Sequence, residues 1–243
     1  MKNIKLGVNI DHIATVRNAR GGEHPNIICA AKIVEASGAD QLTVHVREDR
    51  RHINEHDLEN ILKVINIPLN LEIAANKEMV KIANKYKPSS VCFVPEKRQE
   101  ITTEGGLDII KNYDNLKDII NNLYDDIDVA FFIDPDNEQL KASYELGVKT
   151  VELHTGMYAN AYFENTSSNF ELDKLKKTAS LGEKINVKCA AGHGLNFDNV
   201  SNVASIPHIS ELNIGHFLVG DAIFNGLENS IKKMINILKE SVK

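Results

Sequence analysis

The alternation of short apolar strands with helical patterns along the whole chain limits the possible folds more than any other feature. Eight stretches have the length and the apolar content of strands, and a helical pattern follows each of them. We predict strands at residues 5–10, 41–46, 69–74, 90–94, 128–133, 150–154, 187–191 and 211–215. We predict helices at about 25–37, 54–64, 77–86, 107–123, 136–146, 170–181, 197–204 and 222–240.

Eight such units fit into 243 residues if they close into one barrel, which typically needs about 250 residues. Most of the strands are apolar on both faces, as in strands that lie between a filled barrel interior and a ring of helices. No linker, repeat or low-complexity segment divides the chain. The predicted fold is α/β, with residues 1–243 as a single (β/α)8 barrel of the TIM type, and a doubly wound open sheet is the alternative.

The composition argues against nucleic-acid and membrane partners. The formal net charge is −6, so anionic substrates would need local cationic pockets. No apolar run approaches the ~18 residues of a membrane span, and Asn9 and Asp11 interrupt the first apolar run too early for a signal peptide. Cys29, Cys92 and Cys189 are scattered in apolar surroundings. We therefore expect a cytoplasmic protein whose cysteines are buried thiols, not disulfides or a zinc site.

Polar and titratable residues gather at the carboxyl ends of six predicted strands. The strand at 41–46, for example, ends in His45 and Arg47 and runs into a charged loop up to His52. In a barrel all such ends meet on one face, where barrel enzymes keep their active sites. Burying so many polar groups for packing alone would be costly, so we expect a catalytic site. The residues at these ends are Asn9, Asp11, His12, His45, Arg47, Glu72, Glu152, His154, His193, Gly194, Gly215 and His216.

Glu72 is the candidate for an unusual carboxyl group, because Leu71 and Ile73 flank it. Few water contacts would raise its pKa, which suits a group that transfers protons. A buried carboxylate paired with an arginine is the alternative interpretation.

Two glycine-containing loops follow the last two strands, at 190–194 and 215–221. Small residues let backbone N–H groups approach an anion, and a helix N-terminus adds its dipole. Barrels often bind phosphate at this place, so the loops predict a phosphate site, although tight turns that need glycine are the alternative.

The segment from His52 to His56 matches the H-x-x-E-H spacing of some zinc proteases. That motif needs both histidines on one helical face. Asn54 is a good helix cap, with Asp57 at the capping-box position, so we expect His52 to lie outside the helix and reject a zinc site.

Six long segments are specific enough to suggest a family. They are GVNIDHIATVRNAR at 7–20, TVHVREDRRHI at 43–53, VPEKRQEITTEGGLD at 94–108, ELHTG at 152–156, AGHGL at 191–195 and ELNIGH at 211–216. In these segments the chain resembles the pyridoxine 5′-phosphate synthase family, the last enzymes of one vitamin B6 biosynthetic route.

The resemblance implies a barrel with extra helices that assembles as a homo-octamer of dimers. It also implies an acid–base catalysed condensation without metal or cofactor. The substrates would be 1-deoxy-D-xylulose 5-phosphate and 3-amino-2-oxopropyl phosphate, and the products pyridoxine 5′-phosphate, inorganic phosphate and water. Imine formation, dehydration and ring closure each need a proton delivered or removed, which agrees with several acid–base groups around one cavity.

The resemblance also implies residue roles. His45 would act as a base, Glu72 and His193 as further acid–base groups, and Glu152 would assist a proton transfer. Arg20 belongs to the group that would bind the aminoketone phosphate, which comprises Asn9, Arg20, Gly194, Gly215 and His216. The group that would bind the deoxyxylulose phosphate comprises Asp11, His12, Arg47, His52 and Thr102. Thr102 lies in a loop at 95–106 that would suit a lid that excludes water.

Two other functions compete with this interpretation. A metal-dependent sugar-phosphate aldolase or epimerase would use the same histidines and carboxylates as ligands. A non-catalytic protein that binds sugar phosphates would have no need for His45 and Glu72.

Overall fold

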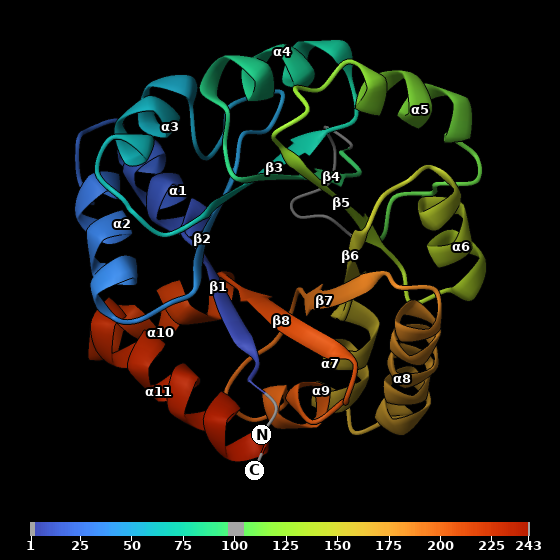
Figure 1. The fold of residues 1–243 in the computed structure, drawn as a ribbon. Coiled ribbons are helices and arrows are strands. Elements are labelled where there is room, and N and C mark those ends of the chain that lie inside the picture. The colour runs from blue at the N-terminus through green and yellow to red at the C-terminus, as the bar shows by residue number, and fades with distance from the viewer. Residues whose placement is uncertain (1–2, 97–104, 243) are drawn as a thin grey trace.

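Eight parallel strands form a closed barrel inside a ring of helices (Figure 1). The computed structural model describes residues 3–96 and 105–242. Each strand pairs with the next, and β8 pairs with β1, which excludes the open-sheet alternative. The predicted barrel is confirmed. Its strands are β1 Lys5–Asn9, β2 Gln41–His45, β3 Leu69–Ala74, β4 Ser90–Val94, β5 Asp128–Ile133, β6 Thr150–His154, β7 Lys188–Gly192 and β8 Ile209–Ile214.

The helices follow the strands as the sequence predicts, with three additions. The main ring consists of α2 Ile27–Ala36, α3 Glu55–Leu62, α4 Lys77–Tyr86, α5 Tyr113–Asn121, α6 Asn137–Glu145, α8 Ser168–Lys184, α9 Val200–Ala204 and α11 Leu227–Ser241. The three helices that we did not predict are α1 Asp11–Arg20, α7 Gly156–Phe163 and α10 His216–Asn225. Each of them follows directly on the carboxyl end of a strand, β1, β6 or β8.

Two predicted helix boundaries are wrong for local reasons. The helix predicted at 222–240 is two helices, because Gly226 has a φ of 81° and ends α10 before α11 begins. The helix predicted at 107–123 spans only Tyr113–Asn121. Residues before it form turns in which Asp108 accepts a hydrogen bond from the backbone N–H of Lys111.

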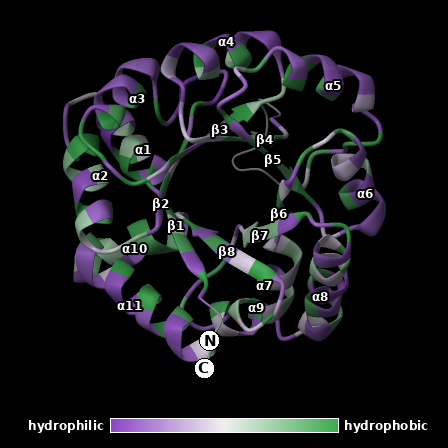
Figure 2. Ribbon diagram, viewed as in Figure 1, coloured by the Kyte–Doolittle hydropathy of each residue, from purple (hydrophilic) through white to green (hydrophobic). Residues whose placement is uncertain are grey.

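The two faces of the barrel wall differ in polarity, which corrects the prediction of strands that are apolar on both faces. On β2, Leu42 and Val44 belong to the main core against the helices, whereas Thr43 and His45 alternate with them. Figure 2 shows hydrophilic segments on the outer side of α3, α4 and α11, which face away from this core. The apolar part of the interior is a small separate cluster formed by Cys92, Val94, Ala130 and Phe132. The rest of the interior is therefore free to carry polar side chains.

The cysteines match their prediction only in part. Cys92 and Cys189 are buried free thiols, but Cys29 is exposed on α2, so its predicted burial is wrong. Among the described residues, no helix is both long and apolar enough to cross a membrane.

Candidate active site

A cavity of about 420 Å³ opens at the carboxyl ends of the strands. This volume is in the range of small-molecule sites. Most of the predicted site residues line it, although they come from segments far apart in the sequence. They are Asn9, Asp11, His12, His45, Arg47, His52, Glu72, Glu152, His193, Gly194, Gly215 and His216. The predicted convergence of these residues at one end of the barrel is confirmed, whereas their roles stay predictions.

Of the predicted site residues that the structure describes, one does not line this cavity. Arg20 is exposed at the C-terminal end of α1 and is absent from the cavity wall. Thr102 lies outside the described residues, so its predicted role stays a prediction.

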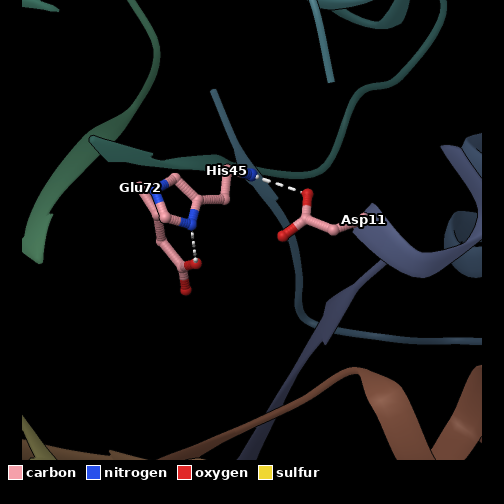
Figure 3. A group of neighbouring side chains, drawn as sticks. All are labelled: Asp11, His45 and Glu72. Atoms are coloured by element: carbon pink, nitrogen blue, oxygen red, sulfur yellow. Dashed lines mark hydrogen bonds and ion pairs between the residues drawn. The ribbon is translucent and has the colours of Figure 1, made fainter. Parts of the chain in front are cut away.

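Asp11 joins the ends of β1 and β2. Its Oδ1 accepts a hydrogen bond from the backbone N–H of His45 at 2.8 Å, and its Oδ2 accepts one from Asn9 Nδ2 at 2.7 Å. Asn9 Oδ1 in turn accepts from the backbone N–H of Asp11 at 2.9 Å. The bond from the His45 backbone to Asp11, drawn in Figure 3, holds the end of β2 against the start of α1.

Glu72 has the environment of a proton donor. Its side chain is 16% exposed, and its Oε2 lies 3.8 Å from His45 Nδ1 and 3.5 Å from Asn9 Nδ2. Burial, followed by repulsion from Glu152 and Asp11, raises the pKa of Glu72 well above its usual range. The group therefore favours its protonated form more than an ordinary carboxyl group does, in line with its flanking apolar residues.

Glu152 lies deeper in the barrel, where Asn213 holds it. Asn213 Nδ2 donates a hydrogen bond to Glu152 Oε2 at 2.7 Å, and both side chains are buried. Burial raises the pKa of Glu152 to about 8, although the bond from Asn213 opposes that rise. We did not predict Asn213, although its alternation with Leu212 and Ile214 on an apolar strand was the available signal.

His193 occupies a strained backbone position in the loop after β7. Its φ is 84° and that of Gly194 is 77°, a region that side chains other than glycine rarely adopt. Burial, followed by the neighbouring His154, lowers the pKa of His193 to about 4. His193 is therefore neutral in the cavity near pH 7. Such a strained residue at a cavity wall is typical of functional sites.

His154 packs against His193, although we assigned no role to His154 from the sequence. Its Nδ1 lies 3.1 Å from Asp134 Oδ1, and its ring packs edge-on against His193 with centroids 5.0 Å apart. Gly156 begins α7 against both rings, since a Cβ there would come within 2.4 Å of His154 Nε2.

The two glycine loops form one wall of the cavity, as predicted. Gly194 and Gly215 both line it, and α10 begins directly after Gly215. A Cβ at Gly215 would lie 2.8 Å from Asn9 Cβ, so only glycine fits there. Gly215 also leaves the first turn of α10 without a side-chain cap. Uncapped N–H groups at a helix N-terminus are suited to bind an anion.

Arg47 and His52, which follow β2, also line the cavity. Arg47 is 3% exposed and supplies a fixed positive charge. His52 Nδ1 lies 2.7 Å from Thr15 Oγ1, and burial, followed by the neighbouring His45 and His12, lowers the pKa of His52 to about 4. His52 therefore acts here as a neutral hydrogen-bonding group, and Arg47 carries the charge.

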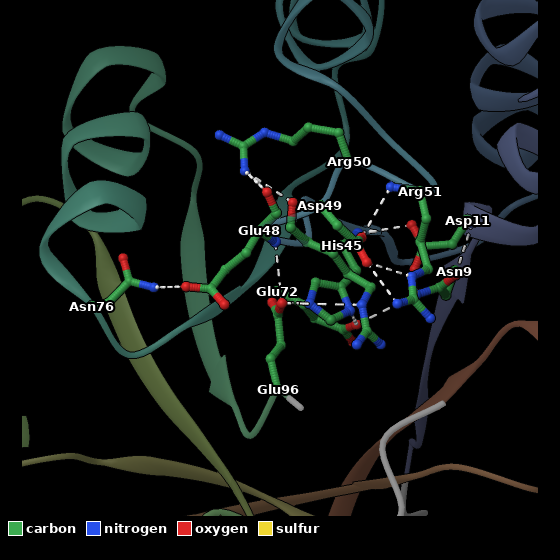
Figure 4. A network of polar contacts seen from close by, with 11 residues as sticks. Asn9, Asp11, His45, Glu48, Asp49, Arg50, Arg51, Glu72, Asn76 and Glu96 are labelled. Atoms are coloured by element: carbon green, nitrogen blue, oxygen red, sulfur yellow. Dashed lines mark hydrogen bonds and ion pairs between the residues drawn. The ribbon is translucent and has the colours of Figure 1, made fainter. Parts of the chain in front are cut away.

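Glu96, which we did not predict, contacts the other nitrogen of His45. Its Oε1 lies 2.8 Å from His45 Nε2, and its Oε2 accepts a hydrogen bond from the backbone N–H of Glu48 at 3.1 Å (Figure 4). Burial opposes ionisation of Glu96, but the bonds from His45 and Glu48 outweigh it and hold its pKa below the usual range. No periodicity places Glu96, because it follows β4 and meets His45 only when the barrel closes.

Three of these residues are close enough to hold a cation. Ligand atoms of Asp11, His45 and Glu72 all lie within 4.8 Å of one another. However, Asn9 Nδ2 donates to Asp11 and also lies 3.5 Å from Glu72 Oε2, so an N–H donor sits between the two carboxyl groups. The raised pKa of Glu72 also disfavours the ionised form that would bind a cation. The donor set therefore fits a proton-transfer network better than a divalent ion.

The rejected zinc motif is explained by the local fold. Asn54 and Asp57 form a complete capping box at the start of α3, and His52 lies outside that helix, as predicted. His56 lies inside α3, where its Nε2 is 3.0 Å from Asn60 Nδ2.

Comparison with known proteins adds independent evidence. Residues 6–240 match the model of a family described as pyridoxal phosphate biosynthesis protein PdxJ. The pyridoxine 5′-phosphate synthase of Zymomonas mobilis is 52% identical over 96% of this chain and 91% of its own. That of a Sulfurihydrogenibium species is 50% identical over 99% of this chain and 100% of its own.

Solved structures support the fold alone. A thiamine phosphate pyrophosphorylase from Pyrococcus furiosus superposes with a TM-score of 0.64 over 99% of this chain and 98% of its own, at 14% identity. A Streptococcus mutans protein described as KGPDC also has a TM-score of 0.64, at 13% identity over the full length of both chains. At this identity the likeness concerns the barrel and not its chemistry.

Proposed function

We propose that the cavity at the mouth of the barrel is where the pyridine ring is built, since the chain belongs to the family of the pyridoxal phosphate biosynthesis protein PdxJ. It is an enzyme of vitamin B6 biosynthesis that makes pyridoxine 5′-phosphate. This activity excludes the alternative of a non-catalytic protein that binds sugar phosphates. The substrates and the residue roles that follow are proposals.

The two substrates that we propose are 1-deoxy-D-xylulose 5-phosphate and 3-amino-2-oxopropyl phosphate. The amine of one condenses with the ketone of the other to an imine and releases water. Further dehydration, loss of one phosphate and ring closure then give the aromatic product. Each step moves protons between carbon, nitrogen and oxygen, so it needs acids and bases on more than one side of the substrate.

The proton donors and acceptors in the cavity suit this sequence of steps. The pKa of Glu72 is raised well above its usual range and that of Glu152 to about 8, so both groups hold a proton more readily than ordinary carboxyl groups. His193 is neutral near pH 7, and His45 Nδ1 lies 3.8 Å from Glu72 Oε2. We propose that His45 removes protons from the substrate and that Glu72 and His193 complete the transfers. Glu152, held by Asn213, guides one of these steps.

Two phosphorylated substrates need two anion sites, and the cavity has two walls suited to them. The wall of Gly194, Gly215 and His216, with the N-terminus of α10, would hold the aminoketone phosphate. The wall of Arg47 and His52 would hold the deoxyxylulose phosphate. Arg20 and Thr102 stay proposed contacts from the resemblance alone.

The observation that carries the proposal is the convergence of two buried carboxyl groups, Glu72 and Glu152, and the imidazoles of His45 and His193 in one cavity. The direct test is to mix both substrates with purified enzyme, with and without chelator, and to follow the pyridine chromophore and phosphate release. We expect both signals to appear together and chelator to have no effect. Phosphate binding without a chromophore would contradict the proposal.

One observation favours a metal-dependent variant of the chemistry, namely the approach of Asp11, His45 and Glu72. That variant predicts stoichiometric zinc in the purified protein and loss of activity on chelation. The same assay therefore separates the two mechanisms.

We also propose that the chain forms homo-oligomers, an octamer built from dimers, in the cytoplasm. Large exposed apolar side chains on the additional helices, such as Phe163 at 86% and Phe224 at 87% exposure, support assembly. The free thiols suit a reducing compartment. Analytical ultracentrifugation of the purified protein tests the octamer, which a monomeric species would contradict.

A further inference from the structure

The contact between Glu96 and His45 determines which nitrogen of His45 can take part in chemistry. The two side chains are buried, 7% exposed for His45 and 4% for Glu96, and their contact is 2.8 Å long. Glu96 is further fixed by the Glu48 backbone N–H on its Oε2, and Arg47 Nε lies 4.0 Å from that same oxygen. This is a rigid buried carboxylate aimed at one ring nitrogen.

An ionised carboxylate can only accept hydrogen bonds. Because the backbone N–H of Glu48 and the nearby charge of Arg47 favour the ionised form of Glu96, the hydrogen in the 2.8 Å contact belongs to His45 Nε2. This is so whether the ring is neutral or protonated. In the neutral ring the lone pair is then on Nδ1.

Nδ1 faces the cavity side of the ring. It lies 3.8 Å from Glu72 Oε2, and Glu72 lines the cavity, whereas Glu96 does not. At 3.8 Å the two groups do not form a direct hydrogen bond, so Nδ1 stays open to a substrate proton. Figure 4 shows the His45 ring between the two carboxyl groups.

We propose that Glu96 is a positioning residue that holds His45 in the Nε2–H tautomer and makes Nδ1 the atom that accepts the substrate proton. This inference rests on the proposed role of His45 as the base. In the step, a substrate bond to hydrogen breaks, its electron pair stays on the substrate, and a new Nδ1–H bond forms. The resulting imidazolium lies against the Glu96 carboxylate, which stabilises it.

The tautomer can be measured without any turnover. Nitrogen NMR chemical shifts of histidine-labelled enzyme distinguish Nε2–H from Nδ1–H, and His45→Asn identifies the His45 signal. We expect Nε2 to carry the hydrogen in the wild-type enzyme. An Nδ1–H tautomer would overturn the inference.

Kinetics provide the second test. In Glu96→Gln the charge is lost and the amide can also turn its NH2 group toward the ring, which favours the wrong tautomer. We expect kcat to fall about 10²-fold or more, with KM within about threefold, and Glu96→Asp to recover part of the loss. Glu164→Gln is the control for the same chemical change, because Glu164 is exposed and distant in the sequence from this network, and it should keep wild-type kcat.

The possible outcomes distinguish a failure of the role of Glu96 from a failure of the proposed function. Wild-type kcat in Glu96→Gln overturns the role of Glu96 while the proposed function stands. A wild-type enzyme that forms no pyridine ring contradicts the proposed function, and the tautomer measurement still decides what Glu96 does. If Glu96→Gln loses its circular dichroism signal, the wild-type tautomer and Glu96→Asp decide.

Discussion

The proton on Glu152 links the site to the stability of the whole fold. Burial raises the pKa of Glu152 from 4.5 to about 8, so the folded enzyme keeps a proton that the unfolded chain loses. This contribution is fully present below about pH 4.5 and is lost as the pH rises toward 8. Each pH unit in that window lowers stability by about 1.4 kcal/mol, which gives a total of the order of 5 kcal/mol.

Glu152→Gln removes this dependence, because glutamine mimics the neutral acid and its oxygen still accepts the bond from Asn213. The free energy of unfolding, measured by urea at fixed protein concentration, should favour the variant increasingly between pH 5 and pH 8. Glu164→Gln, a change at an exposed glutamate, should show a flat difference over the same range. A flat difference for Glu152→Gln as well would refute the buried neutral acid.

Three further predictions concern catalysis. Glu72→Gln should lower turnover about 10²-fold or more with an unchanged circular dichroism spectrum, and near-normal turnover would exclude an acid–base role. Arg47→Lys replaces a planar fork with a point charge, so calorimetry should show deoxyxylulose phosphate bound roughly 1.5–3 kcal/mol more weakly and the aminoketone phosphate almost unchanged. Equal weakening of both would mean that the two phosphate walls are wrongly assigned. Exhaustive chelation should leave activity intact, whereas activity lost on chelation and restored by zinc would support the metal-dependent variant.

The sequence was sufficient for the barrel because each strand carries its own signal. Short apolar runs bounded by turns and followed by helical patterns identify strands locally, and eight of them leave few ways to bury their faces. The site followed from the same reasoning, since parallel strands present their carboxyl ends on one face. His45, Glu72 and Glu152 were found in this way.

The additional helices were missed because their own sequences give weak signals. Helix α1 buries only Asp11, Ile13 and Ala14, so the apolar repeat of a typical amphipathic helix is missing. Helices α7 and α10 begin directly at strand ends, and they lack a side-chain cap that would mark their start. Packing against neighbouring elements, and not local preference, determines these three helices.

Glu96 and Asn213 were missed for a different reason. Each acts through a partner that is distant in the sequence: Glu96 meets His45 across 51 residues, and Asn213 meets Glu152 across 61. Such contacts exist only once the barrel is closed, so the sequence shows neither pairing, although Asn213 stands out as a polar residue on an apolar strand. Arg20 is the opposite case. Only the family resemblance predicted it as a substrate-binding residue, and it does not line the cavity.

The central claim is that His45 is the base of a ring-forming reaction, and His45→Asn in metal-free buffer tests it most directly. Asparagine keeps a polar side chain at the rim but cannot take up a substrate proton. The backbone N–H that bonds Asp11 is also unchanged. The account predicts that the variant binds both phosphorylated substrates with near wild-type affinity and forms no pyridine chromophore. Chromophore formation at a rate near that of the wild-type enzyme would contradict it.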